Sequence, residues 1–389
     1  MSKNLLFIPG PVTVADAVLA ASAQPMIDHR GPEFKAILAR IAERLKPVFG
    51  TERADVLMLG SSGTGGLEAA VGNLFGPGDR VLACPIGVFG QRLIAIARGF
   101  GCEVEILETE WGNATDPAAL RARLQGDGGR FDGVLLTHNE TSTGAQNDMA
   151  ALAGAVRGSG AFTVVDSVSG LAASEFRMDE WGFDVVVAAS QKALAAPPGL
   201  AMVAVAPRAW ERIEANVGAQ RFYFDLKKAR DFAALGQTPW TPPVSVAFGL
   251  DAGLAEFERL GAAAVHRRHA RYAQAIRAAA EALGLALFSQ PGAHSPTVVA
   301  IRLPEGIDGD AIRTSMREAR GVVIGGGQGT LKGSIVRIGT MGDLTQTDIL
   351  GAIGAFEIAL LEAGAPIHVG TGVQAALKVF LEAGQPAAV

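Results

Sequence analysis

The chain has very little cysteine. Only Cys84 and Cys102 occur among 389 residues, and they do not form a Cys-x-x-Cys pair. A disulfide framework and a cysteine-based zinc cluster are therefore not expected. The six histidines are scattered, and the close pair His266 and His269 lies in an arginine-rich helical stretch, which is typical of a solvated helix face. The sequence therefore predicts no metal site.

Long apolar runs and a surplus of positive charge are also missing. No uninterrupted apolar segment reaches the roughly 20 residues that a bilayer-spanning helix needs. The stretch 1–10 is too short for a signal peptide and is interrupted by Pro9, and the last three residues (387–389) are not a peroxisomal signal. The net charge is −5, without a basic stripe. We expect a cytoplasmic protein that binds neither membrane nor nucleic acid.

What is abundant is apolar material arranged in short runs. Apolar residues make up 49% of the chain and charged residues 19%, which is typical of a globular protein with one large and one small domain. Strands are expected at 55–59, 80–83, 103–107, 133–138, 162–168, 184–189 and 200–205, with helices between them. Several runs are continuously apolar, as strands buried on both faces are. The fold predicted is α/β, a mostly parallel sheet sandwiched by helices.

The pattern changes near residue 261. A polar, proline-bearing connection (221–243) leads into a long helix, and an alanine- and arginine-rich helical run follows at 262–283. Further short strands are expected at 297–302, 322–324 and 335–338. We therefore expect an N-terminal arm (1–21), a large α/β domain (22–260) and a smaller C-terminal α+β domain (261–389).

A single lysine directly follows one of the apolar runs. Lys192 comes just after 183–189, and Pro197, Pro198 and Gly199 follow it closely. It is therefore expected at the carboxyl end of a buried strand. Burial disfavours the ammonium form, and a neutral lysine amine can form a Schiff base with an aldehyde. The alternative is a lysine whose stem lies along the strand end while its charge reaches solvent.

A glycine-rich turn follows the strand expected at 55–59. Residues 60–66 read Gly-Ser-Ser-Gly-Thr-Gly-Gly and open a helical stretch. Such a turn exposes backbone N–H groups at the positive end of a helix, where a phosphate can bind, and Ser62 and Thr64 add hydroxyl groups. Glu68 stands where a dinucleotide fingerprint needs glycine, and no Lys-Ser/Thr pair completes a P-loop. A purely structural turn remains the alternative.

Two polar clusters occupy the ends of other strands. Asp166 follows the β-branched residues Val164 and Val165 at the end of a strand. A carboxylate there needs a cationic partner, and a pyridinium N–H is one. The alternative is an aspartate that caps the next helix. The segment 137–144, Thr-His-Asn-Glu-Thr-Ser-Thr-Gly, is a dense polar cluster directly after a strand. Ligands of open parallel sheets bind at the carboxyl ends of the strands, so this position favours a site over a plain loop.

Taken in chain order, these motifs resemble the class V aminotransferases, specifically the alanine–glyoxylate / serine–pyruvate (serine–glyoxylate) branch. The lysine signature lies at 190–199, and further matches lie at 8–12, 61–65, 137–144, 166–168 and 337–339. The resemblance spans nearly the whole chain. It implies a fold-type I transferase that depends on pyridoxal 5′-phosphate and works as a homodimer with shared active sites.

The resemblance also implies a role for each matching residue. Lys192 would hold the cofactor as an internal aldimine and move a proton, and Asp166 would pair with the pyridine nitrogen. Arg337 would bind the substrate carboxylate, for which its planar guanidinium is suited, and Gly10 would lie beside the substrate. Without the resemblance, Arg337 would be interpreted as half of a surface ion pair. The other cofactor contacts implied are Ser62, Gly63, Thr64, Phe89, Thr141, Val168 and Gln191, with Thr238 and Thr241 reaching the partner's phosphate.

Within that set, Phe89 would stack on the cofactor, Val168 would pack on its other face, and Thr141 would lie near the ring oxygen.

The function implied is ping-pong transfer of an amino group from serine or alanine to glyoxylate or pyruvate. Aspartate, ureidoglycine or 2-aminoethylphosphonate remain alternative donors. A dicarboxylate donor would need a second cation, for which Arg30, next to His29, is a candidate.

Three other functions are weighed. A cysteine desulfurase needs a cysteine nucleophile in the C-terminal part, and both cysteines precede Lys192. An NAD-dependent oxidoreductase would share the parallel sheet, but the Gly-x-Gly-x-x-Gly fingerprint is missing. A cofactor-binding regulator would need a DNA-binding segment, and neither a helix-turn-helix pattern nor a basic arm is evident.

Overall fold

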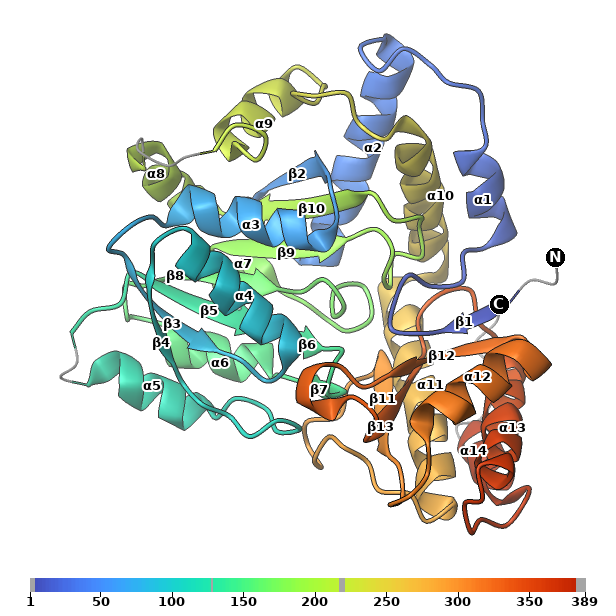
Figure 1. Ribbon diagram of the computed structural model, residues 1–389. Coiled ribbons are helices and arrows are strands. Elements are labelled where there is room, and N and C mark those ends of the chain that lie inside the picture. The colour runs from blue at the N-terminus through green and yellow to red at the C-terminus, as the bar shows by residue number, and fades with distance from the viewer. Residues whose placement is uncertain (1–3, 127–128, 217–220, 383–389) are drawn as a thin grey trace.

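The computed structural model describes residues 4–126, 129–216 and 221–382 and contains two main sheets (Figure 1). The larger has seven strands in the order β2-β10-β9-β8-β5-β3-β4. Their bounds are β2 Asp55–Gly60, β3 Arg80–Cys84, β4 Glu103–Ile106, β5 Gly133–Thr137, β8 Phe162–Asp166, β9 Val185–Ala189 and β10 Leu200–Val205. Each strand was predicted from the sequence, several of them because a continuous apolar run identifies a strand buried on both faces.

One strand runs against the others. β10 pairs antiparallel with both of its neighbours, β2 and β9, and all remaining pairs are parallel. β2 therefore points the same way as the five other strands, so its carboxyl end lies at the same edge of the sheet. The mostly parallel α/β sheet is confirmed, and the single reversed strand does not move any strand end from that edge.

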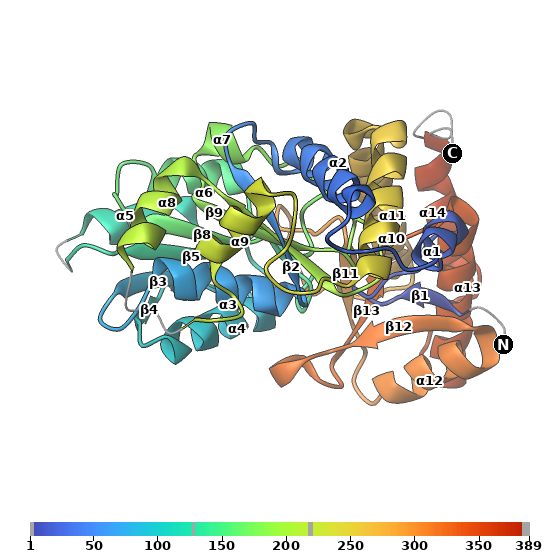
Figure 2. The same ribbon diagram turned by 90° about the horizontal axis from the view of Figure 1, so that it is seen from above.

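Helices cover both faces of this sheet (Figure 2). Alternate strand residues point to opposite faces; in β9, Val187 packs against one helical layer and Val186 against the other. The first layer holds α3 Gly63–Leu74, α4 Val88–Gly99, α8 Pro207–Ala215 and α9 Leu226–Ala234. The second holds α2 Pro32–Phe49, α5 Pro117–Gln125, α6 Met149–Val156, α7 Met178–Trp181 and α10 Val244–Leu260.

The second sheet has four strands in the order β1-β12-β13-β11. Its strands are β1 Leu5–Phe7, β11 Val298–Arg302, β12 Val322–Gly326 and β13 Ile335–Gly339. The helices around it are α11 Ala262–Ala282, α12 Gly309–Arg320, α13 Gln346–Glu362 and α14 Thr371–Glu382, with a 3-10 turn η1 Gly329–Leu331. Phe7, Ile276 and Phe356 belong to one core with these strands. The strands β11, β12 and β13 lie where the sequence predicted them.

Two features differ from what the sequence predicted. β1 is a strand that pairs parallel with β12, Leu6 opposite Val323, where an N-terminal arm without a strand was predicted. The stretch interpreted as a polar connection contains α9. The division at residues 22 and 261 remains a prediction. The rest of the fold comprises α1 Asp16–Ser22 and the two-stranded ribbon β6 Asn139–Glu140 and β7 Ala145–Gln146.

The interpretation of the histidine pair as a solvated helix face is wrong. His269 is fully buried and His266 is partly buried. The reason is helical spacing: Val265, His269, Tyr272 and Ile276 all lie on the buried stripe of α11. Burial lowers the pKa of His269 to about 3, so its imidazole is neutral.

Candidate active site

The carboxyl edge of the large sheet gathers the polar residues that the sequence singled out. Asp166 is the last residue of β8, Thr137 ends β5, and Lys192 follows β9. Ser62 follows β2 at the same edge, because β2 and β9 point the same way. The arrangement follows from strand direction alone and brings together residues up to 130 positions apart in the chain.

A tight loop after β9 holds Lys192. The buried Ser190 hydroxyl donates to the Pro197 carbonyl at 2.7 Å, and the Ala195 N–H donates to the Lys192 carbonyl at 2.9 Å. The amine of Lys192 donates to the Pro9 carbonyl. A Cβ on Gly10 would lie 2.8 Å from that amine, so glycine is required for this close approach.

The amine of Lys192 is shifted toward its neutral form. Burial lowers its pKa from 10.5 to about 8, although the carboxyl group of Asp166 opposes the shift. Arg337 and Arg92 lower it further. An amine with a pKa near 8 is partly neutral at neutral pH, which a Schiff-base nucleophile requires.

Asp166 is almost completely buried, at 4% exposure. Burial raises its pKa to about 7, against the opposing effect of the Val168 N–H, which donates to Oδ1 at 3.0 Å. The charge of Glu140 raises the pKa further, and Lys192 lowers it. A carboxyl group in this state is stabilised as a carboxylate by an added cationic N–H, which a protonated pyridine nitrogen supplies.

The glycine-rich turn leaves donors free at the start of α3. Ser62 is the N-cap residue, but its side chain makes no capping hydrogen bond and is exposed. The first two amides of the helix, those of Gly63 and Thr64, have no intrahelical acceptor because helix geometry provides none. A helix N-terminus with open amides and a nearby hydroxyl is suited to a phosphate group.

Glycine at position 63 also brings this turn against Val168. A Cβ added at Gly63 would lie 2.8 Å from Cγ2 of Val168 and 3.2 Å from Cβ of Ala189. Any larger residue would push the turn away from β8 and β9. The structure thus packs Val168 directly against the glycine-rich turn. Both are therefore near enough to contact the same bound cofactor.

Gln191, next to the lysine, carries a buried amide oxygen without a hydrogen-bond partner. A buried unpaired acceptor is costly. The amide orientation is interchangeable, and rotating it by half a turn would present its NH₂ group in the same place. The NH₂ group of Gln191 could then donate a hydrogen bond to an acceptor such as a phosphate oxygen.

Glu140 is a buried acid that the sequence reasoning left without a role. Its Oε2 accepts from the amides of Phe89 (3.0 Å) and Gly90 (3.1 Å), and its Oε1 accepts from the amide and hydroxyl of Ser142 (3.0 and 2.6 Å). Burial raises its pKa, and these four donors oppose that shift. The carboxyl group therefore fixes the first turn of α4, and with it the backbone of Phe89.

Arg337 is held at the border of the two sheets. Its Nε donates to the Gly326 carbonyl at 2.7 Å and its Nη1 to the Thr141 carbonyl at 2.8 Å. The side chain is 6% exposed, and burial lowers its pKa to about 10, with Glu140 opposing the shift. The guanidinium stays charged at neutral pH. The structure does not support the alternative of a surface ion pair, since Arg337 is buried.

A second set of buried hydrogen bonds joins the same two sheets. The Asn139 amide donates to Ser169 at 2.8 Å and to Thr297 at 2.9 Å, and its carbonyl accepts from Ser295 at 2.6 Å. Thr297 precedes β11 of the second sheet, and Ser169 follows β8 of the first. The network fixes the strand ends that carry Arg337 and Asp166 relative to each other.

Thr238 and Thr241 lie in a different position. Thr238 donates to the carbonyl of Trp240 at 2.7 Å, and Thr241 is exposed. Arg30 donates to the Gln237 side chain (2.7 Å) and to the Thr238 carbonyl (2.9 Å). Arg30 therefore braces this segment within its own chain, and no contact places it beside Lys192.

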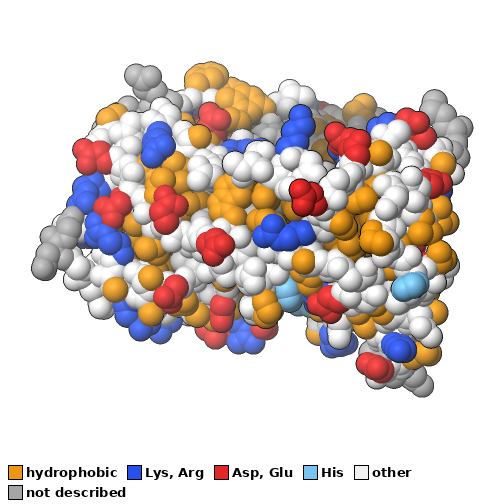
Figure 3. Space-filling model, turned by 60° about the horizontal axis from the view of Figure 1, so that its bottom comes forward, with side chains coloured by type: hydrophobic (Ala, Val, Ile, Leu, Met, Phe, Trp, Pro, Cys, Tyr) orange, Lys and Arg blue, Asp and Glu red, His pale blue; other side chains and the backbone are white. Residues whose placement is uncertain are grey.

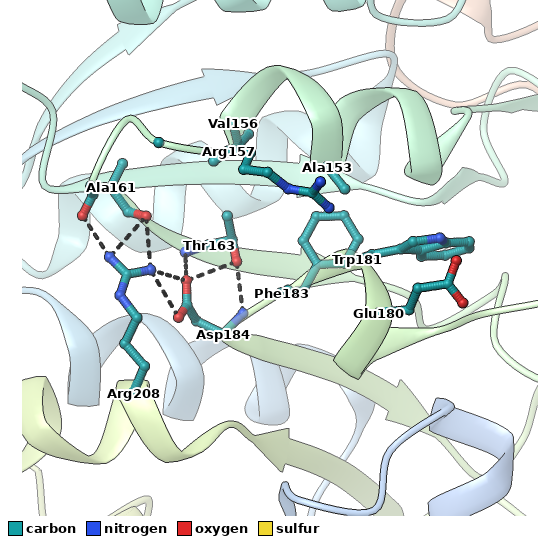
Figure 4. A pocket seen from close by; sticks show the side chains of 13 residues that line it. Ala153, Val156, Arg157, Ala161, Thr163, Glu180, Trp181, Phe183, Asp184 and Arg208 are labelled. Atoms are coloured by element: carbon teal, nitrogen blue, oxygen red, sulfur yellow. Dashed lines mark hydrogen bonds and ion pairs between the residues drawn. The ribbon is translucent and has the colours of Figure 1, made fainter.

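One hollow in the described part of the chain lies away from this site. A cavity of about 470 Å³ lies at the amino ends of β8 and β9, the opposite edge of the sheet. Figure 4 shows Asp184 there, bonded to Thr163 and to Arg208 at 3.1 Å. The polar side chains at its floor are thus paired with one another, which is typical of a structural cluster.

Pyridoxal 5′-phosphate fits the residues at the carboxyl edge. The turn at Ser62 offers open amides for the phosphate, and Gln191 has an unpaired buried amide atom beside it. Asp166 is an acid whose ionised form needs a cation, and Lys192 is an amine of lowered pKa. The individual contacts of the predicted site residues with the cofactor remain predictions.

Comparison with known proteins gives a consistent result. The profile of the aminotransferase class-V family matches residues 16–349. The chain is 39% identical over 383 residues to the L-aspartate–glyoxylate aminotransferase of Paracoccus denitrificans, covering 97% of this chain and 96% of the relative. It is 34% identical over 388 residues to the serine–glyoxylate aminotransferase of Methylorubrum extorquens, covering 98% and 96%. A protein of Anabaena cylindrica named soluble hydrogenase 42 kDa subunit is 39% identical over 381 residues, covering 97% and 99%.

Solved structures show the same likeness in three dimensions. Ureidoglycine–glyoxylate aminotransferase from Bacillus subtilis superposes with a TM-score of 0.92 at 30% identity, covering 98% of this chain and 99% of that one. Pyridoxamine–pyruvate aminotransferase from Mesorhizobium loti gives 0.93 at 29% identity, covering 98% of each chain.

The site geometry predicts how Asp166 sets the titration of Lys192. Replacement of Asp166 by Asn removes the charge that raises the lysine pKa. The lysine amine should then become neutral at lower pH than in the unchanged protein, where the midpoint lies at about 8. The rate of cofactor uptake by the apoprotein, followed by stopped-flow absorbance across pH 6–10, reports this midpoint.

Asp184→Asn, which removes a buried carboxylate at the opposite edge of the sheet, is the matched control and should leave the midpoint unchanged. An Asp166→Asn protein with the same midpoint as the unchanged protein would contradict the coupling.

Proposed function

Because the chain belongs to the class-V aminotransferase family, we propose that it moves the amino group of a small amino acid, serine or alanine, onto glyoxylate or pyruvate. The chain is an aminotransferase that uses pyridoxal 5′-phosphate. When bound, this cofactor withdraws electrons from the substrate Cα and so eases the loss of its proton. The transfer runs by a ping-pong route, donor first and acceptor second.

The observation that carries the proposal is the convergence of Lys192, Asp166 and Arg337 at one edge. Their charges act on one another: Asp166 and Arg337 both shift the pKa of Lys192. Lys192, with a pKa of about 8, is suited to accept the Cα proton and to return it near neutral pH. Arg337 remains charged and faces the border with the second sheet, where it is suited to bind a substrate carboxylate.

The approach to the lysine favours a small substrate side chain. The Pro9 carbonyl accepts a hydrogen bond from the Lys192 amine, and a Cβ on Gly10 would lie 2.8 Å from that amine, so the backbone of these two residues lies directly against the lysine. A bulky side chain on the substrate would meet this backbone. Arg30, the candidate second clamp for a dicarboxylate, uses its guanidinium on Gln237 and Thr238. Serine and alanine therefore rank above aspartate as donors, and glyoxylate is the shared acceptor in the names of three relatives.

A hydrogenase function is not proposed despite the name of the Anabaena relative. Cys84 and Cys102 are both buried, and burial raises the pKa of Cys84 to about 12, which disfavours the thiolate that metals bind. Among residues 4–126, 129–216 and 221–382, no three His, Cys, Asp or Glu side chains are grouped to ligate a metal ion. Lys192, Asp166 and Arg337 instead favour amino-group transfer.

A second copy of the chain is inferred as a partner. Phe222 is 70% exposed yet stacks on Trp240 with ring centroids 4.9 Å apart, and the Lys228 amine lies 4.8 Å from the Phe222 ring. Trp240 donates to the Tyr223 carbonyl at 2.9 Å, and Tyr223 donates to the Gly60 carbonyl at 3.2 Å, beside the glycine-rich turn. Ordered, exposed aromatic clusters are typical of protein interfaces. Since Thr238 and Thr241 lie in the same segment, this cluster supports a homodimer with shared active sites.

The helices and the surface also bear on a membrane association. Within the described ranges, no helix is both long enough and apolar enough to span a bilayer. The face shown in Figure 3 carries acidic and basic side chains interspersed rather than gathered by sign. A cytoplasmic location remains a prediction of the sequence, as does the lack of nucleic-acid partners.

A donor panel tests the proposed activity. The cofactor-loaded protein is mixed with serine, alanine or aspartate, and the loss of its visible absorbance is followed for each half-reaction. Serine or alanine should discharge it fastest, and glyoxylate or pyruvate should restore it. A protein that responds to aspartate alone would overturn the donor proposal while leaving the aminotransferase assignment intact.

Arg337 should govern substrate affinity and not cofactor affinity. Replacement by Ala removes a charged bidentate donor, so KM for the donor amino acid should rise by about 10- to 100-fold, and replacement by Lys should give an intermediate value. The visible absorbance of the loaded protein should not change. Arg302→Ala, an exposed arginine on the neighbouring β11, is the control. Equal KM values for the Ala variant and the unchanged enzyme would contradict this role.

The dimer proposal predicts a change in mass. Phe222→Asp places a charge in the exposed aromatic cluster and should convert the dimer to monomer in sedimentation velocity. Leu381→Asp on α14, at 78% exposure, is the matched control and should leave the dimer intact. A Phe222→Asp protein that sediments as the unchanged protein does would count against this interface.

A further inference from the structure

One cation beside the glycine-rich turn has no function in the account so far. Arg92, in α4, donates from Nη1 to the Thr64 hydroxyl at 3.1 Å. Most other arginines with ordered polar contacts pair with a carboxylate, as Arg40 and Arg44 do with Asp251. Arg92 forms no ion pair within the described part of the chain. Its positive charge is thus directed at the turn and is not neutralised by an acid.

The same side chain lies over the ring of Phe89. The guanidinium carbon is 4.6 Å from the ring centroid, a cation–π geometry. Phe89 and Arg92 are three positions apart on α4, so they lie on one helix face. Arg92 therefore contacts two parts of the predicted cofactor site, the ring of Phe89 and the turn at Thr64.

Both ends of this connection are fixed by other contacts. Glu140 accepts from the amides of Phe89 and Gly90 and so anchors the first turn of α4. Gly63 packs against Val168 and so anchors the turn on the sheet. A guanidinium that spans two anchored elements has little freedom, and its position is set before any ligand arrives.

The charge of Arg92 affects the pKa values of Lys192 and Asp166. It lowers the pKa of Lys192, after the larger effects of burial, Asp166 and Arg337. It also lowers the pKa of Asp166. Of the two arginines that act on Lys192, Arg337 lies at the border with the second sheet and is proposed to bind the substrate carboxylate. Arg92 lies on the other side, where the open amides of α3 begin.

We propose that Arg92 is a cofactor-positioning residue that holds the Phe89 ring against the phosphate-binding turn and supplies positive charge for the phosphate dianion. A phosphate monoester carries a charge of about −1.5 to −2 at pH 7. Open helix amides supply only partial positive charge. Arg92 is a full cation, and it contacts this turn through the Thr64 hydroxyl. The inference rests on the use of pyridoxal phosphate by this chain and does not depend on which amino acid is the donor.

Lysine could not substitute fully for Arg92. A guanidinium is planar, so it can lie on an aromatic ring and donate from its edge at the same time, whereas an ammonium is a compact point charge. Arg92→Lys should therefore keep part of the attraction for phosphate and lose the ordering of the Phe89 ring.

The test compares binding of two cofactor forms to the apoprotein. Pyridoxal 5′-phosphate and pyridoxal, which lacks the phosphate, are titrated into the unchanged protein and into the Arg92→Ala and Arg92→Lys variants, with visible absorbance as the readout. Arg98→Ala, an exposed arginine on the same helix, is the matched control. Near-ultraviolet circular dichroism and the thermal midpoint show that each variant is folded.

In Arg92→Ala the dissociation constant of pyridoxal 5′-phosphate should rise by about tenfold or more, as expected for loss of one contact to a charged group. That of pyridoxal should rise much less, and Arg98→Ala should change neither. Unchanged affinity for pyridoxal phosphate in Arg92→Ala, or an equal loss for both forms, would overturn the proposal. Failure of the unchanged protein to bind pyridoxal phosphate would instead refute the proposed function.

Discussion

Burial of an amine and an acid at the same edge of one sheet is the constraint on which the site depends. Lys192 and Asp166 both lie where desolvation disfavours their charged forms, and each partly restores the charge of the other. Their pKa values are thereby brought to about 8 and about 7. Two groups that would be far from titration in water thus both titrate near neutral pH. Strand direction and the loop after β9 hold them there.

Charged residues around this pair define two sides of the site. Arg337 lies toward the second sheet, fixed by the carbonyls of Gly326 and Thr141. Arg92 lies toward the glycine-rich turn. Glu140 sits between them, its carboxyl group fully used by four donors, and its charge acts on Asp166, Lys192 and Arg337 alike. A substrate carboxylate and a cofactor phosphate thus meet separate cations, which favours one orientation of the bound pair.

Much of the fold could be predicted because its signals are local. Several strands of the large sheet are continuous apolar runs, and a residue that follows such a run lies at the strand end, so the positions of Lys192 and Asp166 followed from the sequence. β1 could not be predicted in this way. It is three residues long, and its strand state depends on pairing with β12, more than 300 positions away. His269 was misjudged because its polar neighbours conceal the buried stripe of α11.

The site residues that sequence reasoning missed act through partners distant in the chain. Glu140 is one of several polar residues in its segment, and only the fold brings the amides of Phe89 and Gly90 to it. Arg92 follows Phe89 by three positions, a spacing that puts both on one helix face and could have indicated a contact. Its bond to Thr64, however, requires α3 and α4 to be neighbours. Neither contact leaves a signature in composition or periodicity.

Chemical capture of the cofactor tests the central claim most directly. The loaded protein is reduced with borohydride, digested, and its peptides are analysed by mass spectrometry, which shows the residue that carries the reduced cofactor. The account predicts that the mass of the reduced pyridoxal phosphate group is found on Lys192 and is lost in Lys192→Ala. Its attachment to another lysine, or to none, would contradict the assignment.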